Sequence, residues 1–218
     1  MKLIIDPLLP HEAATVSGVA LANQRNLRRS GYIPKNSGHA RFTLEETAEL
    51  LVFGSLSERG IGPKVSSTFA KTAARGIFLK TLHMAEIYTP EAAAAAHEVT
   101  KPEADTEIQY ILKSGQLKSE VVETHRRWHH GALAKKHLAE LIEAQVGARG
   151  EKTPDMFILF PNGHPEFFYD GKLPFEDVIY GHPAWQGPMI MFSMGGMAAQ
   201  LASRLPRPMV RLAPDSAK

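Results

Sequence analysis

A short segment in the N-terminal third combines arginines with turn-forming residues and separates two stretches of helical pattern. Residues 28–43 have the sequence RRSGYIPKNSGHARFT. Gly31 is placed to end a helix in the left-handed conformation, and Pro34 prevents the helix from resuming directly. Residues 36–38 (NSG) favour a turn between two short extended pieces. The segment therefore predicts a helix that ends near Gly31 and a small β-ribbon after it.

Helical patterns lie on both sides of this segment. Residues 10–17 predict a short helix with Pro10 in its first turn, and residues 19–31 predict a second helix of about three turns. Two short helices joined at a glycine-containing turn form a helix-turn-helix. In the second helix, the inward side is assigned to Ala20, Leu21 and Leu27, with Gln24 able to lie on either side.

A well-marked helix start follows the ribbon. Thr43 is a favourable capping residue, and Glu46 stands three positions later, as in a capping box. Apolar residues then recur at helical spacing until Gly60. A further helix is expected from Pro63, because proline suits the first turn of a helix.

Charge is distributed unevenly along the chain. The 218 residues carry a net charge of only +2, but residues 1–80 contain 11 Lys and Arg against 6 Asp and Glu. Residues 13–44 contain no acidic residue at all. A one-sided basic patch is typical of proteins that bind polyanions; chance clustering on a solvated face is the alternative. The cations in this acid-free stretch are Arg25, Arg28, Arg29, Lys35 and Arg41.

The order of these signals resembles the DNA-binding domain of MerR-type winged helix-turn-helix regulators. The resemblance is carried by Arg25, GYIP at 31–34, ARFT at 40–43 and ERGIGP at 58–63. It covers about a third of the chain, and Leu27 stands where the family usually has an aromatic residue. The resemblance implies that the second helix enters the major groove of double-stranded DNA, and that two copies bind as a dimer.

Candidate DNA contacts follow from side-chain chemistry. Arginine, glutamine and asparagine form paired hydrogen bonds with base edges, whereas contacts with phosphates fix the register of the protein on the duplex. The base-reading candidates are Gln24, Arg25, Asn26 and Arg28. The phosphate candidates are Arg29, Tyr32, Lys35, His39 and Arg41.

The middle of the chain is expected to be helical. Two short helices are predicted, one starting at Thr89 and Pro90 and one ending near Gly115, and residues 116–150 form the longest helical stretch. MerR-type regulators pair through a long helix after the DNA-binding domain, so the resemblance implies a dimer helix over residues 117–147. A helix packed within its own subunit is the alternative. The dimer-interface candidates are Leu138, Leu141 and Ile142.

Histidines on this long stretch raise the question of a metal site. His125 and His129 are four residues apart, a spacing that can bind zinc. The chain has no cysteine, and Arg126 and Arg127 add positive charge there. We therefore expect solvated or hydrogen-bonded histidines, and neither a metal nor any other cofactor. A second phosphate-contacting patch at residues 125–130 is a further alternative.

The last third predicts a small α+β unit. Residues 156–160 and 166–169 form a hairpin, residues 188–194 a strand, 195–205 a helix and 208–212 a final strand. Its many aromatic and methionine residues suit a hydrophobic core, an apolar effector pocket or a pliable interface. Ser193 in FSMGG resembles a hydrolase nucleophile, but Met191 replaces the first glycine of that motif. We therefore predict no enzymatic activity.

Together these patterns predict a mainly α protein with a small α+β C-terminal unit. The expected domains are a winged helix-turn-helix over residues 1–80, a helical connector and dimer helix over 81–150, and an effector or interaction domain over 151–218. No apolar run is long enough to cross a membrane, and the expected location is cytoplasmic and nucleoid-associated. The expected function is dimeric, sequence-specific DNA binding in transcriptional regulation, with an unknown small-molecule or protein effector. An architectural or recombination accessory protein, such as an excisionase-like factor or chromosome organiser, and a protein-interaction module are the alternatives.

Overall fold

A computed structural model describes residues 1–34, 40–115, 121–169 and 187–214. The chain is mainly helical, with a small β part, and divides into two compact units. Residues 6–81 and 151–207 form one of them, which we call the six-helix unit; residues 1–5, 82–150 and 208–218 form the other, the hairpin unit. The C-terminal third is thus not a domain of its own, because most of it belongs to the same unit as the N-terminal helices.

Two short helices open the six-helix unit, as predicted. Helix α1 spans Pro10–Ser17 and α2 spans Leu21–Arg29. Gly18 between them has a φ of 75° and donates its backbone N–H to Ala14 O at 2.9 Å. A side chain would strain this left-handed conformation, which explains the glycine. The inward side of α2 differs from the prediction: it consists of Gln24 and Leu27, whereas Leu21 is exposed.

The segment after α2 returns to the start of α1. Phe42 forms an antiparallel bridge with Leu8, with paired backbone hydrogen bonds of 2.7 and 2.9 Å. Tyr32 donates its backbone N–H to Leu27 O and so closes the end of α2. The tip of the predicted ribbon, residues 35–39, lies outside the described residues.

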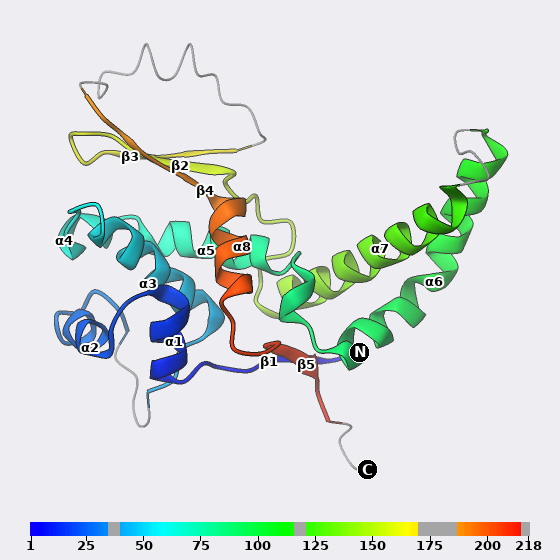
Figure 1. Cartoon of the computed structure of the whole chain (residues 1–218), viewed down its shortest axis with the longest axis horizontal. Helices are drawn as coiled ribbons and strands as arrows, with labels where there is room; N and C mark the ends of the chain where they lie inside the picture. Colours follow the sequence, from blue (N-terminus) through cyan, green and yellow to red (C-terminus); the bar gives the residue numbers. More distant parts are fainter. Residues whose placement is uncertain (35–39, 116–120, 170–186, 215–218) are drawn as a thin grey trace. The chain divides into compact units, whose positions relative to one another are not determined.

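The next helices form the core against which α1 and α2 pack (Figure 1). Helix α3 spans Leu44–Ser57, and its predicted capping box is confirmed: Thr43 Oγ1 accepts from Glu46 N, and Glu46 Oε2 accepts from Thr43 N. Gly54 of α3 lies so close to α1 that an added Cβ would be 2.8 Å from Ser17 O. The helix predicted from residue 63 is two helices, α4 (Pro63–Ser66) and α5 (Ala70–Thr81).

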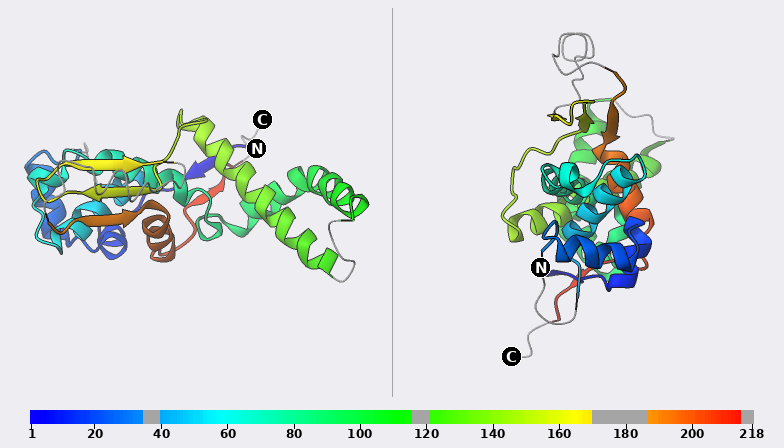
Figure 2. Two further views of the ribbon diagram at one scale, coloured as in Figure 1. Left: turned by 90° about the horizontal axis from the view of Figure 1, so that it is seen from above. Right: turned by 90° about the vertical axis from the view of Figure 1, so that its left-hand side faces the viewer.

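A three-stranded antiparallel sheet completes the six-helix unit. Its strands, in the order β3-β2-β4, are β2 (Met156–Leu159), β3 (Pro165–Phe168) and β4 (Ile190–Ser193). The predicted hairpin is confirmed, since β2 pairs with β3 from Met156 opposite Phe168 to Leu159 opposite Pro165. Helix α8 (Met194–Ser203) follows β4 directly and packs against α5 (Figure 2). The aromatic residues here build a core: Phe157 is fully buried, and its ring lies 4.7 Å from that of Phe69.

The hairpin unit consists of two long antiparallel helices and a two-stranded sheet. Strand β1 (Leu3–Ile5) pairs with β5 (Val210–Leu212), and a single 3-10 turn, η1, spans Ala85–Ile87. Helix α6 spans Pro90–Lys113 and α7 spans Val122–Gln145. The prediction of two short helices before residue 115 was wrong, because α6 continues through Pro102.

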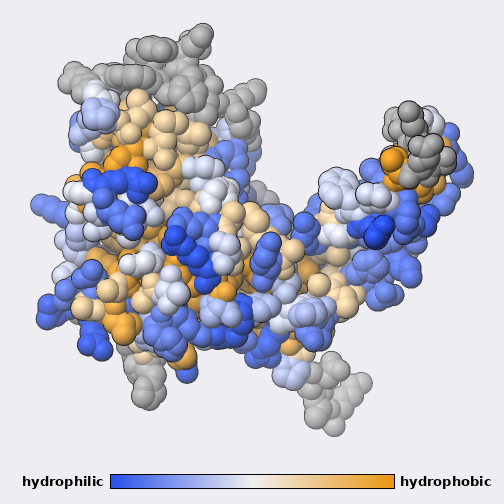
Figure 3. Space-filling model, viewed as in Figure 1, coloured by the Kyte–Doolittle hydropathy of each residue, from blue (hydrophilic) through white to orange (hydrophobic). Residues whose placement is uncertain are grey.

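Every fourth residue along each long helix is buried, which explains why the two helices pair. On α6 these positions carry mostly alanine, and on α7 they run from His130 to Ile142. Small side chains at a four-residue spacing let two helices approach closely along their whole length. The outer surface of the hairpin is mostly hydrophilic on the face seen in Figure 3. The buried positions are Ala92, Ala96, Thr100, Ala104 and Ile108 on α6, and His130, Ala134, Leu138, Ala139 and Ile142 on α7.

None of the helices within the described ranges is both long enough and apolar enough to cross a membrane.

Candidate nucleic-acid interface

One face of α2 is fully exposed and carries the chemistry expected of a nucleic-acid contact. Ala22, Arg25, Asn26 and Arg29 lie at the helical spacing that places side chains on one side, and all four are exposed. Arg29 Nη2 donates to Asn26 Oδ1 at 2.9 Å, so a planar guanidinium and an amide are held next to each other. This face offers several hydrogen-bond donors in fork geometry and no acidic group.

Gln24 does not belong to this face, and its prediction as a base-reading residue was wrong. Its side chain is only 2% exposed. The amide Nε2 donates to Pro10 O at 3.1 Å and to Val19 O at 2.9 Å. Both amide hydrogens are therefore used to hold α2 against α1 and the turn between them, and Gln24 has no route to a base edge.

Arg28 also has a different position from the one predicted. It is half-buried, its Nε donates to Pro34 O at 3.1 Å, and its guanidinium carbon lies 4.7 Å from the centre of the Phe42 ring. A cation over an aromatic face is attracted by the ring quadrupole. Arg28 thus connects α2 to both ends of the segment 34–42 and does not lie on the exposed face with Arg25 and Asn26.

Three of the five phosphate candidates, Arg29, Tyr32 and Arg41, lie within the described residues. Arg29 and Arg41 are exposed at the end of α2 and just before Phe42, and Tyr32 is half-buried. Lys35 and His39 lie outside the described residues. Arg29 and Arg41 are therefore the phosphate candidates that are exposed among the described residues.

The carboxylate of Glu12, in the first turn of α1, is already paired. Glu12 accepts from Leu9 N at 2.7 Å and forms an ion pair with Arg207. Partial burial alone would raise the pKa of Glu12, but the Leu9 N–H and the Arg207 guanidinium outweigh it and hold that pKa below its usual range. The charge of Glu12 is thus compensated locally and does not oppose an anion at α2.

Two of the three dimer-interface candidates, Leu138 and Ile142, lie on the packed side of α7. Leu138 is 1% exposed and Ile142 is fully buried, both within the α6–α7 hairpin of a single chain, and Leu141 is half-buried. The alternative interpretation, a helix packed within its own subunit, describes these residues. A contact between two copies that used Leu138 or Ile142 would first have to separate α7 from α6.

Two histidines of the long helix, His129 and His130, pair with residues of α6. His129 Nε2 lies 2.5 Å from Glu107 Oε2, and His130 contacts His97 Nε2 at 3.3 Å and Asp105 Oδ1 at 3.2 Å. Within the described residues, no three histidine or acidic side chains are grouped so as to hold a metal ion. Sequence analysis singled out the histidines but had no signal for their partners, which lie more than twenty positions away.

Ser193 has a structural role. Its hydroxyl oxygen accepts from Gly196 N at 3.1 Å and caps the start of α8. All of segment 170–186 lies outside the described residues.

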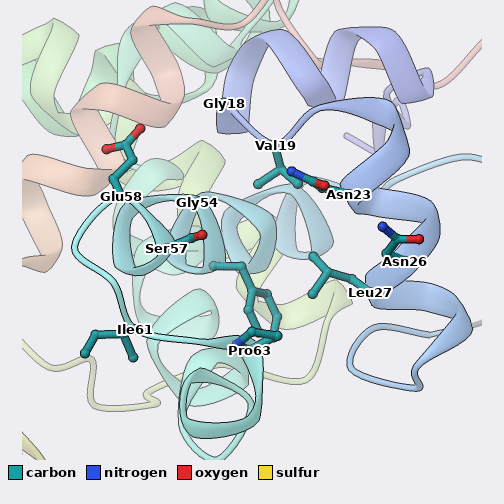
Figure 4. A pocket seen from close by; sticks show the side chains of 11 residues that line it. Gly18, Val19, Asn23, Asn26, Leu27, Gly54, Ser57, Glu58, Ile61 and Pro63 are labelled. Atoms are coloured by element: carbon teal, nitrogen blue, oxygen red, sulfur yellow. The ribbon is translucent and has the colours of Figure 1, made fainter.

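A groove runs along the side of α2. It has a volume of about 400 Å³, with Asn23, Asn26 and Leu27 on the α2 side and residues of α3 and the α3–α4 turn on the other (Figure 4). Asn23, like Ala22, was missed by sequence reasoning. Both follow from the helical spacing once Gln24 and Leu27 are placed inside, so the wrong inward side concealed them.

No protein-family model, no curated protein and no solved structure matches this chain. Its function must therefore be inferred from its own residues.

Proposed function

We propose that residues 6–66 form a winged helix-turn-helix and that the chain is a sequence-specific DNA-binding protein that regulates transcription. The observation that carries the proposal is the exposed face of α2, where Arg25, Asn26 and Arg29 lie together in a stretch without a single acidic residue. A helix that follows a turn and presents such a face is suited to the major groove. The resemblance to MerR-type regulators agrees with this assignment.

Each residue of the face has a role in the proposal. Arg25 suits guanine and Asn26 suits adenine, because each can form two hydrogen bonds with that base. Ala22, near the start of α2, suits the methyl group of thymine. Arg29 and Arg41, both exposed, contact phosphates in this proposal.

A dimer belongs to the proposal, because two helix-turn-helix units read two half-sites more selectively than one. The contact between copies must lie outside Leu138 and Ile142, which are buried within the chain. Among the dimer-interface candidates Leu138, Leu141 and Ile142, the half-buried Leu141 is the one that a second copy could touch.

Selection of binding sites from a random DNA pool tests the proposal. Wild type should enrich a defined motif, and Arg25→Ala or Asn26→Ala should lose preference at one position or one symmetric pair, a cost of about 1–3 kcal/mol at the matched base. Lys136→Ala is the matched control, because it removes one exposed cation from the hairpin unit. No enriched motif would contradict sequence-specific binding; DNA binding without a motif would favour the architectural alternative.

A further inference from the structure

A second concave surface lies beside α2. Among the residues that the structure describes, it shares no lining residue with the groove of Figure 4. It has a volume of about 280 Å³. It is bounded by the first turn of α1, by α2 and by the residue that leads into the Phe42 bridge. The residues used below are Pro10, His11, Leu21, Arg25, Arg28 and Ala40.

The charges around this hollow have one sign. Arg25, Arg28 and His11 line it, and none of its lining residues within the described ranges is acidic. Glu12, the neighbour of His11 in the chain, has its carboxylate bonded to Leu9 N and Arg207 instead. An anion in the hollow would therefore meet two permanent cations and one group that gains charge on protonation.

The three groups come from two helices: His11 lies in α1, and both arginines lie in α2. Of the two arginines, Arg28 is held in position. Arg28 donates its Nε to Pro34 O and stacks on Phe42, so its guanidinium is oriented before any ligand arrives. Among the described residues, the hydrogen bond of Arg28 uses only Nε, so both Nη groups can donate to an anion. His11 is exposed in the first turn of α1 and lies across the hollow from α2.

We propose that this hollow seats a phosphate of the DNA backbone, with His11 and Arg28 as its contacts and Arg25 at the rim shared with the base-reading face. The inference rests on the proposed function and adds His11 to it as a phosphate contact that depends on pH. A backbone phosphodiester stays ionised from pH 8 to pH 6, whereas histidines gain charge over that range. DNA affinity should therefore rise as the pH falls. The charged groups near His11 are Arg25, Arg28 and the paired Glu12.

Fluorescence anisotropy with a labelled duplex, at pH 8 and pH 6 and at several salt concentrations, tests this assignment. Wild-type affinity should increase by about three- to tenfold at pH 6, as expected for one added charged hydrogen bond. His11→Gln should lose most of the increase in affinity between pH 8 and pH 6, and its salt slope at pH 6 should be smaller than that of wild type by about one. His83→Gln is the matched control, because it removes an exposed histidine of the hairpin unit.

The outcomes separate the two proposals. If wild type does not bind DNA, both the proposed function and the phosphate hollow are overturned. If wild type binds DNA, and His11→Gln responds to pH and salt as wild type does, the proposed function stands and the hollow is overturned.

Discussion

Helix α2 and the α6–α7 hairpin solve the problem of burial in opposite ways. Helix α2 is short and almost wholly polar, and its two buried residues are Leu27 and the amide Gln24, which is bonded to two backbone carbonyls. The hairpin is long and buries a stripe of alanines together with Ile108, Leu138 and Ile142, while the large Val99, Tyr110 and Trp128 stay exposed. The polarity and size of a side chain are thus poor guides to whether it is buried in α2 or in the hairpin. Burial depends on whether another helix or a backbone carbonyl lies within contact distance of that side chain.

This difference has a consequence for function. A helix fixed by one amide and one leucine keeps nearly its whole surface for contact, which suits an element that must be inserted into a groove of another molecule. The hairpin uses its four-residue stripe for its own cohesion, so that stripe is not available to a partner. The two regions therefore differ in what they leave exposed: α2 leaves most of its polar residues exposed, and the hairpin covers its stripe with its own two helices.

The largest expected effect concerns the hairpin stripe. Leu138→Ala should lower the free energy of unfolding by about 2–5 kcal/mol, because it removes a fully buried side chain and leaves a cavity. Urea unfolding, with hydrogen exchange followed on peptides of α6 and α7, measures it. Leu141→Ala is the control and should cost clearly less, since Leu141 is half-buried.

The same variants separate packing within a chain from contact between copies. Sedimentation of Leu138→Ala, under conditions where it is folded, should give the same oligomeric state as wild type. A loss of oligomer with little change in stability would show that Leu138 faces a second copy, and the contrast between α2 and the hairpin would then fail.

Local signals in the sequence were reliable wherever a few neighbouring residues decide the structure. The capping box of Thr43 and Glu46, the stop at Gly18 and the β2–β3 hairpin were all predicted correctly. Each depends on backbone geometry over a few residues, which the residue types largely determine.

The errors arose where long-range pairing decides. Gln24 was assigned to DNA because a glutamine amide can pair with adenine, but its amide donates to the carbonyls of Pro10 and Val19. Leu138 was assigned to a dimer because α6 was not recognised as its partner along the whole length. The sequence of α6 contains many alanines and a proline and therefore carries no strong apolar signal. The contact between α6 and α7 could not be predicted from the pattern of either helix alone.

Gln24 provides the next test of the contrast. Gln24→Ala should destabilise the six-helix unit by about 1–3 kcal/mol, because two carbonyls near α2 lose their donor. Thermal unfolding measures the change, and Asn23→Ala, on the exposed side, should stay within about 0.5 kcal/mol of wild type. Binding-site selection with folded Gln24→Ala should return the wild-type motif. A changed motif would place Gln24 at the DNA after all.

The continuity of α6 gives a smaller effect of opposite sign. Pro102 lies inside the helix, where its ring removes one backbone hydrogen bond. Pro102→Ala should therefore raise the stability of the hairpin unit by about 1–2 kcal/mol, less than the full cost of an interior proline because alanine also loosens the unfolded chain. Pro90→Ala is the matched control: at the first helical position a proline costs nothing, so no gain is expected. Reduced stability of Pro102→Ala would mean that the hairpin needs two separate helices, as the sequence suggested.

The smallest expected effect concerns a partly buried carboxylate of the six-helix unit, and it depends on pH. Burial raises the pKa of Glu49 in α3 to about 7, opposed by Lys71 and reinforced by Glu46 and Glu45. Because the folded-state pKa lies above that of an unfolded glutamate, the native state binds this proton more tightly. The resulting stability is fully present at pH values below the unfolded pKa and is lost as the pH rises through about 7.

Glu49→Gln should therefore be more stable than wild type at pH 8 by about 1 kcal/mol, a value reduced for partial exposure, and nearly equal to it at pH 5. Urea unfolding at both pH values measures this, with hydrogen exchange locating the gain in α3 and α5. Glu58→Gln, an exposed carboxylate in the same unit, should show no such dependence. An equal gain for Glu49→Gln at pH 5 and pH 8 would mean that repacking, and not a proton held by the buried carboxylate, accounts for the effect.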